Sequence, residues 1–346
     1  MRRLIFLVVL LPLLILPVSG AQYSAPQAPE GASDLLPEEP ETFGEGLWYV
    51  VKHAIAAVKP ELAETAGICL GVVGILLLTT LLHAFPGESQ SVAAMVGTVA
   101  VAGILLNPMH TLIRMGVETA RQLSDYGKLL LPVMTAAMAA QGSGITSAAL
   151  YTGTAVFDAA LMQFLTYVVV PGLYGYLALA VASCALGDGA LKKVQDFVKW
   201  LLTWGLKAVL YLFSGYMAIT RVISGTADAA AVKAAKLAIS GVVPVVGGML
   251  SDASEAVLAG AGAVKGAVGL YGLLALLAIW IEPFLKIGIP YWMLKLTAAL
   301  CGSFGPKQST DFLQDFASAM GLLLAMVGTM CLLLLISTVC FIKGVG

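Results

Sequence analysis

Four ionisable side chains lie within apolar stretches of this 346-residue chain: Asp158, Lys207, Glu282 and Lys286. A charge at membrane depth is costly, so such residues are candidates for a function. Carboxylates in this setting commonly carry protons or ions, pair with a cation, or contact a neighbouring helix. Asp158 and Glu282 are the two carboxylates that an ion or proton relay would need.

Glu282 and Lys286 are four residues apart, which places both side chains on one face of a helix. Pro283 lies between them and disturbs the first turn of such a helix. Three interpretations stay open for these residues and for Asp158. They are a structural role through pairing or snorkelling, a proton or ion relay, and contacts with the helices of a partner.

No enzyme signature is present. The glycines over 260–266 lack the spacing of a dinucleotide-binding turn, and residues 305–310 lack the first glycine and the spacing of a phosphate-binding loop. His53, His83 and His110 lie far apart and form no metal-binding motif. We therefore expect a chain without catalytic residues, cofactor or metal, which takes energy for any transport from a partner or a gradient.

The stretch 237–272 is apolar enough for a membrane, yet it carries charges and many glycines. Pro244, Gly247 and Gly248 interrupt it, because proline removes a backbone donor and glycine weakens a helix by about 1 kcal/mol. We expect two half-helices here, the second capped near Asp252. Broken helices at membrane depth survive where protein covers them or where they line an aqueous cavity.

The same stretch carries a glycine face. Gly262 and Gly266 form a small-xxx-small pair, and Gly269 and Gly272 extend it, so that a neighbouring helix can approach closely. Close packing within this chain is the favoured interpretation, and a pore lining is the alternative.

The composition is that of a membrane protein. Hydrophobic residues make up 59% of the chain and charged residues 11%, whereas soluble domains contain about 25% charged residues. Several apolar runs reach the roughly 18 residues that indicate a spanning helix. The net charge of −1 comes with no basic patch, so we expect no nucleic-acid partner. The expected fold class is an all-α polytopic membrane protein.

Three segments are expected before the membrane domain. Residues 1–21 have a charged start, a short apolar core and small residues for cleavage, as in a signal peptide; a retained anchor helix is the alternative. Residues 22–45 are rich in Pro, Glu, Ser and Gly, which predicts an acidic, disordered linker outside the cytoplasm. Residues 46–66 predict an interfacial amphipathic helix with Val58 on its lipid-facing side.

Residues 67–346 form the predicted multi-span domain, with about seven or eight membrane segments that include one broken or re-entrant segment. Its expected interruptions are a turn at 85–88, an amphipathic connector over 110–128, a break at 141–144, a kink at 171–172, turns at 187–189 and 282–283, and a polar loop over 304–315. Simple alternation of these segments conflicts with the positive-inside rule, so the orientation stays open.

The most specific sequence pattern lies in the interrupted stretch. Residues 239–248 read ISGVVPVVGG, a Ser-Asp pair follows at 251–252, and residues 265–272 read KGAVGLYG. Together with the predicted signal peptide, the acidic linker and the multi-span body, this pattern resembles the stage III sporulation protein AE family of endospore-forming bacteria. The resemblance covers most of the chain.

The resemblance implies a non-enzymatic protein of the mother-cell membrane around the forespore. Its implied partners are the other stage III sporulation membrane subunits and their associated ATPase, besides membrane lipid, and a homo-oligomer is compatible with it. Together these proteins would form a channel-like complex, similar to specialised secretion systems, that supports late forespore gene expression and spore maturation.

Two rival functions stay open. One is a stand-alone secondary transporter whose substrate site lies at the broken helix over 237–272. The other is a structural anchor whose linker and interfacial helix recruit partners outside the cytoplasm.

Overall fold

The computed structural model describes residues 26–29, 31–37, 43–83, 89–187, 189–242 and 247–343, with only the backbone described at 83, 89–94, 221–242, 247–266 and 343. All regular elements in these ranges are helical. In chain order they are η1 (Ser33–Leu35), α2 (Phe43–Ala57), α3 (Lys59–His83), α4 (Ser89–Ala140), α5 (Gly144–Phe164), η2 (Leu165–Val169), α6 (Val170–Leu186), α7 (Gly189–Val242), α8 (Gly247–Cys301) and α9 (Lys307–Lys343).

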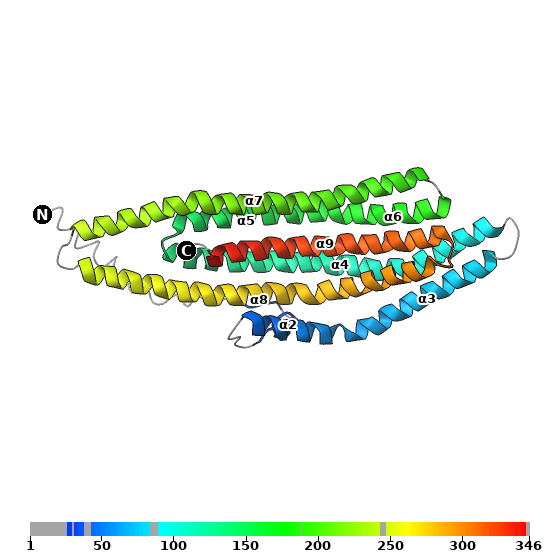
Figure 1. Ribbon diagram of the computed structural model, residues 1–346, viewed down its shortest axis with the longest axis horizontal. Helices are drawn as coiled ribbons and strands as arrows, with labels where there is room; N and C mark the ends of the chain where they lie inside the picture. Colours follow the sequence, from blue (N-terminus) through cyan, green and yellow to red (C-terminus); the bar gives the residue numbers. More distant parts are fainter. Residues whose placement is uncertain are drawn as a thin grey trace.

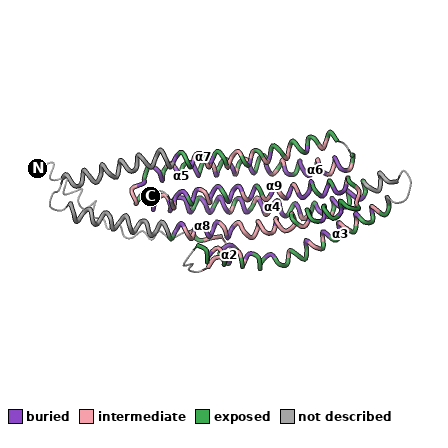
Figure 2. The backbone as a smooth tube through the Cα atoms, viewed as in Figure 1, coloured by how far each residue is buried: buried purple, intermediate pink, exposed green. Residues whose placement is uncertain are grey.

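The long helices run side by side along one axis and form an elongated bundle (Figure 1). Helix α9 lies in the middle and packs against α4 and α8, and it also contacts α5, α6 and α7. Its sequence explains this place, because residues 316–342 contain no charge and many of them are fully buried, Phe316 and Phe341 included. Figure 2 shows the resulting pattern, in which α9 is the most buried of the long helices, α4 alternates buried and exposed residues, and α3 and α7 carry many exposed residues.

Helix α4 contains 52 residues and continues through Pro108 and Pro132. At 1.5 Å per residue it is about 78 Å long. The predicted connector over 110–128 was therefore wrong, since these residues belong to the helix. The reason is that one face of this segment is apolar and buried, as Ile113 and Leu123 show.

Two glycines let α4 approach α9. A Cβ at Gly116 would lie 2.6 Å from a methyl carbon of Leu323, and one at Gly127 would lie 2.7 Å from a methyl carbon of Leu334. The charged residues between these glycines lie on the opposite face of α4. The segment predicted as an amphipathic connector is thus part of a long helix with one packed side and one exposed side.

Helix α8 also continues through its prolines, Pro283 and Pro290. The expected turn at 282–283 was wrong, and so was the polar loop over 304–315, because α9 already begins at Lys307. The buried side chains of Phe312 and Leu313 hold this first part of α9 as a helix.

Other expected interruptions are confirmed. Helix α4 ends at Ala140 and α5 begins at Gly144, with Gly142 between them at φ +85°, a conformation that favours glycine. Helix α6 ends at Gly187, which has φ +67° and acts as a left-handed cap. The kink expected at 171–172 stays a prediction; the structure has a π-helical turn at Leu165–Val169, directly before α6 begins at Val170.

Six helices among the described residues are long and apolar enough to cross a membrane, and the all-helical fold is confirmed. The expected number of seven or eight is not confirmed. Helices α4 and α8 are each continuous where the sequence predicted an interruption, and the number six refers to the described residues alone.

The N-terminal segments differ in part from expectation. Ala32 and Leu35, within the predicted disordered linker, are buried against the bundle, and the Tyr126 hydroxyl donates to the Pro26 carbonyl oxygen at 3.5 Å. The predicted amphipathic helix is divided at Val58, which is buried and not lipid-facing; residues from Lys59 onward belong to α3. The predicted signal peptide lies outside the described residues.

A change at Gly272 tests the close packing of α8. A Cβ there would lie 2.8 Å from both methyl carbons of Leu130 in α4, so Gly272→Leu overfills the contact. We expect it to lower the free energy of unfolding by about 1–3 kcal/mol, measured as a lower midpoint of thermal unfolding in detergent. Gly288→Leu is the matched control, since a Cβ at Gly288 in the same helix meets nothing within 4 Å. Equal midpoints for both variants would contradict this packing.

Candidate functional site

The predicted break lies largely outside the described part of the chain. Pro244 is not described, and the surroundings of Gly247, Gly248, Asp252, Gly262 and Gly266 are not described either. The backbone shows that α7 ends at Val242 and α8 begins at Gly247. The predicted cap near Asp252 is therefore wrong, because that residue lies in the second turn of α8 and not at its start. The roles of the other five residues stay predictions.

The next glycines of the predicted face are described and are packed within the chain. A Cβ at Gly269 would meet Ile342 of α9 and Met134 of α4, and Gly272 faces Leu130 of α4. This part of the glycine face is a packing surface, as the favoured interpretation expected.

Asp158 lies inside the bundle. Its side chain is in α5, only 5% of the residue is exposed, and Oδ2 accepts a hydrogen bond of 2.6 Å from the Ser124 hydroxyl of α4. One turn away, the hydroxyls of Thr154 and Ser337 are 2.6 Å apart, which adds α9 to this polar contact. Asp158 Oδ1 is buried with no hydrogen-bond partner among the described residues. The carboxylate therefore joins helices and does not face lipid.

Glu282 and Lys286 form the expected pair, with Nζ 3.0 Å from the Glu282 carboxylate, and Pro283 does not prevent it. The structure adds a third member that the sequence did not suggest. Glu61, in the first turn of α3, lies 3.0 Å from the same Nζ. Glu61 falls within the amphipathic helix predicted over 46–66, and no local pattern connects residues so far apart along the chain.

A cavity of about 250 Å³ lies beside this triad, between α3, α4 and α8. Its polar lining comes from Glu61, Glu64, Asn107 and Thr111, besides Lys286. Glu61 Oε2 is buried there without a hydrogen-bond partner among the described residues. The cavity opens toward the surface, since Glu64, Asn107 and Thr111 are exposed.

From this cavity a row of exposed polar side chains continues along α4, here called the α4 polar face. Its members recur every three or four residues and therefore share one side of the helix. They are Asn107, His110, Thr111, Arg114, Glu118, Arg121, Asp125 and Lys128.

The charges of the α4 polar face pair along the helix. Arg121 lies 3.5 Å from Glu118, and Lys128 lies 2.7 Å from Asp125, with 56–64% of each of these four side chains exposed. From residue 107 to residue 128 the face extends about 32 Å, close to the roughly 30 Å of a bilayer's hydrocarbon core. Arg, Lys and Asp at the centre of a spanning helix cost about 2.5–3.5 kcal/mol each against lipid. This face therefore needs water or another polar surface beside it.

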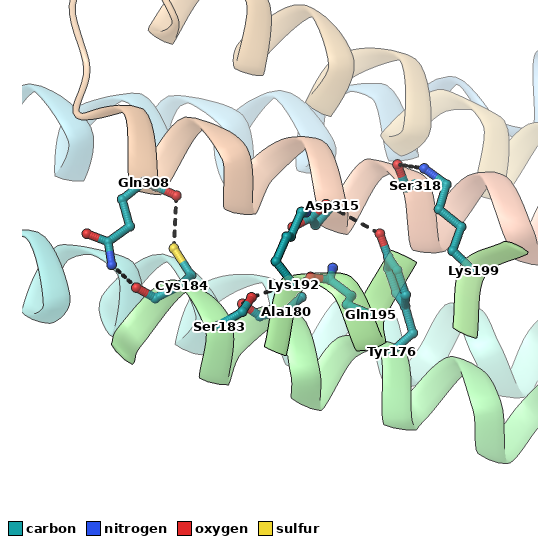
Figure 3. Close-up of polar contacts among 10 residues, drawn as sticks. All are labelled: Tyr176, Ala180, Ser183, Cys184, Lys192, Gln195, Lys199, Gln308, Asp315 and Ser318. Atoms are coloured by element: carbon teal, nitrogen blue, oxygen red, sulfur yellow. Dashed lines mark hydrogen bonds and ion pairs between the residues drawn. The ribbon is translucent and has the colours of Figure 1, made fainter. Parts of the chain in front are cut away.

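A second polar cluster joins α6, α7 and α9 near one end of the bundle (Figure 3). Lys192 donates to the Asp315 carboxylate at 2.5 Å, and the Tyr176 hydroxyl lies 3.5 Å from the same carboxylate. Lys199 donates to the Ser318 hydroxyl at 3.0 Å.

Cys184 and Gln308 connect α6 and α9 at the outer end of this cluster. The Cys184 thiol donates to the Gln308 carbonyl oxygen at 2.9 Å, and the Gln308 amide donates back to the Cys184 carbonyl oxygen. A cavity of about 350 Å³ adjoins them and is lined by Lys307 and Asp311 among others. These reciprocal hydrogen bonds connect the end of α6 to the start of α9, so the cluster stabilises the packing of the helices at this end of the bundle.

No metal centre is evident in the described part of the chain, where no three His, Cys, Asp or Glu side chains converge. None of the five cysteines forms a disulfide, and all five are buried.

Removal of Lys286 tests the triad. Lys286→Met leaves the carboxylates of Glu61 and Glu282, about two-thirds buried, without their shared cation. We expect a loss of about 1–2 kcal/mol in the free energy of unfolding, less than for a fully buried pair because water screens it in part. Thermal unfolding in detergent measures the loss, and adding Glu61→Gln should recover part of it. Lys207→Met, at an exposed lysine of α7, is the control; an equal effect there would rule out the triad's contribution.

Comparison with known proteins agrees with the sequence pattern. A family model described as stage III sporulation protein AE matches residues 37–344. The stage III sporulation protein AE of Bacillus subtilis (strain 168) is 24% identical over 234 residues, which is 66% of this chain and 58% of that protein, so the match spans less than two-thirds of the relative's length. No solved structure matches this chain. Since the family model covers far more than half of the residues, the chain belongs to the stage III sporulation protein AE family.

Proposed function

We propose that this chain is a non-enzymatic membrane subunit of a channel-like secretion complex between mother cell and forespore. The observation that carries the proposal is the family match over 37–344 on a bundle with six candidate spans. In this proposal the protein lies in the mother-cell membrane around the forespore and supports spore maturation and late forespore gene expression. Its partners are other stage III sporulation subunits and an ATPase, in addition to lipid.

The surface of the bundle supports a membrane location with protein partners. Helix α3 exposes Leu77, Leu78 and Leu81, each at least half exposed, and α7 exposes Trp200 and Trp204 in a stacked arrangement. Large apolar side chains in such numbers would be unfavourable in water, so lipid or partner helices must cover them. An ATPase partner fits a chain in which no nucleotide-binding motif occurs.

The stand-alone transporter remains the alternative. Its substrate site was placed at 237–272, and the side chains of most of this stretch lie outside the described residues, so no observation of the structure favours it.

Purification from sporulating cells tests the complex. The full chain, tagged at its C-terminus and extracted in mild detergent, should recover an ATPase and several further membrane proteins, identified by mass spectrometry. A tagged multi-span protein of unrelated function, extracted from the same cells, is the control. The purification is repeated after cross-linking under conditions that preserve other membrane complexes. Recovery of the tagged chain alone in both cases would favour the stand-alone transporter.

Reporter insertions test the six-span arrangement that the proposal uses. In this arrangement four spans lie between the turn at 141–143 and the C-terminal end of α9, so both lie on the same side of the membrane. The turn at 302–306 lies one span before the C-terminal end and therefore on the other side. We expect a reporter inserted at Gly142 and one fused after residue 346 to give the same read-out, and one inserted at Ser303 the opposite read-out. A different read-out at Gly142 and at the C-terminus would show an odd number of crossings between them.

A further inference from the structure

We propose that the α4 polar face borders water within the membrane and forms one wall of an aqueous passage. The proposal rests on the proposed function, because a single helix face forms one wall only and another protein surface in the complex must complete the passage. It assigns the conduit to Asn107–Lys128 of α4 and not to the interrupted stretch around Pro244.

The first step of the argument is to find which parts of other helices lie level with this face. Ser124, between Arg121 and Asp125, donates to Asp158 of α5 at 2.6 Å. Gly127 of α4 packs against Leu334 of α9. These contacts fix α5 near residue 158 and α9 near residue 334 at the level of the charged residues of α4.

Helix α7 lies at the same level. The ring of Phe157, next to Asp158 in α5, is 5.3 Å from the ring of Phe213 in α7 in an edge-to-face arrangement. One cross-section of the bundle thus passes through the charged part of α4 and through α5, α7 and α9.

In this cross-section α5, α7 and α9 each expose an apolar side chain. Val156 of α5 is 61% exposed, Leu212 of α7 is 67% exposed and Leu332 of α9 is 46% exposed. Arg121, Asp125 and Lys128 of α4 are exposed to a similar degree. A segment outside the membrane would not need three apolar sides, and a segment surrounded by lipid would not carry a charged one. An apolar surface toward lipid and a polar surface toward water satisfy both observations.

The polar surface is continuous with the cavity beside the triad. Asn107 and Thr111 belong to both, so that polar groups extend from Glu61 and Lys286 to the end of the face at Lys128. Near the junction, His110 Nδ1 is 2.7 Å from the Tyr174 hydroxyl of α6. The pairing of the charges is compatible with water beside them, because each exposed pair still has free hydrogen-bonding positions.

The charges of the face also indicate what would pass. Arg114, Arg121 and Lys128 supply three positive charges, and Glu118 and Asp125 supply two negative charges, which leaves 3 − 2 = +1. Alternating signs along the wall do not concentrate ions of one sign. This wall would therefore select neither cations nor anions.

Cysteine labelling tests the proposal on the full chain in membranes from disrupted sporulating cells. Single substitutions Arg121→Cys and Asp125→Cys probe the polar face, and Val156→Cys and Leu332→Cys are matched controls at the same level. The five native cysteines are buried and supply a low background, which the unsubstituted chain measures. The probe is a trimethylammonium methanethiosulfonate, which is charged and does not cross lipid. Labelling after denaturation gives the total reactive thiol of each variant.

We expect the two polar-face cysteines to react roughly tenfold faster than the two controls, because a thiol in contact with water ionises and meets the charged probe. Equal rapid labelling at all four positions would place this segment outside the membrane, and equal protection would show that protein or lipid covers the face. Either result overturns the proposal.

Recovery of partners with each variant separates this test from that of the proposed function. If the partners are recovered and the polar-face cysteines stay protected, the complex stands and the passage lies elsewhere. If the cysteines react but the chain is recovered alone, the face borders water in a protein that works without the complex. A variant that accumulates to less than the unsubstituted chain is replaced by Lys128→Cys or Glu118→Cys, which are equally exposed.

Discussion

Packing around α9 is the interaction on which the rest of the bundle depends. This helix has no charge from Phe316 to Ile342, and it contacts five other long helices. Its neighbours are adapted to it, because Gly116 and Gly127 of α4 leave room for its leucines and Gly269 of α8 leaves room for Ile342. Hydrophobic burial alone does not order helices in lipid, where tails are as apolar as leucine, so close van der Waals contact must do so.

Polar contacts then fix which helix lies beside which. Ser124 and Asp158 join α4 to α5, Thr154 and Ser337 join α5 to α9, and Lys192 and Asp315 join α7 to α9. Each of these polar pairs forms at only one relative position of its two helices, whereas two apolar helix surfaces could pack equally well after a shift of one turn. The charged residues that interrupt apolar sequence are thus largely used inside the bundle. Lys207 of α7 and the charges of the α4 polar face are exposed instead, and only the α4 charges form a row along one helix face.

The class of the fold followed from composition and from the apolar runs, and glycines at 142 and 187 correctly marked two helix ends. The interruptions predicted from charge and proline were wrong at 110–128 and at 282–283. In both cases the pattern along the chain was polar or helix-breaking, but one buried face and the hydrogen bonds of the flanking turns kept the helix continuous. Of the candidate site, the pair Glu282–Lys286 could be predicted because its members are four residues apart. Glu61 could not, since only tertiary packing of α3 on α8 brings it there.

The lengths of α7 and α8 have a mechanical consequence. These helices contain 54 and 55 residues, which correspond to about 81 and 83 Å, so roughly 50 Å of each must project beyond a hydrocarbon layer about 30 Å thick, counting both sides. If this length is shared equally between the two sides, each projecting arm is about 25 Å long and acts as a lever. A tilt of the membrane part by about 5° then moves the tip of such an arm by roughly 2 Å. A partner that binds such an arm outside the membrane could thus shift the helices within the bilayer without itself entering the bilayer.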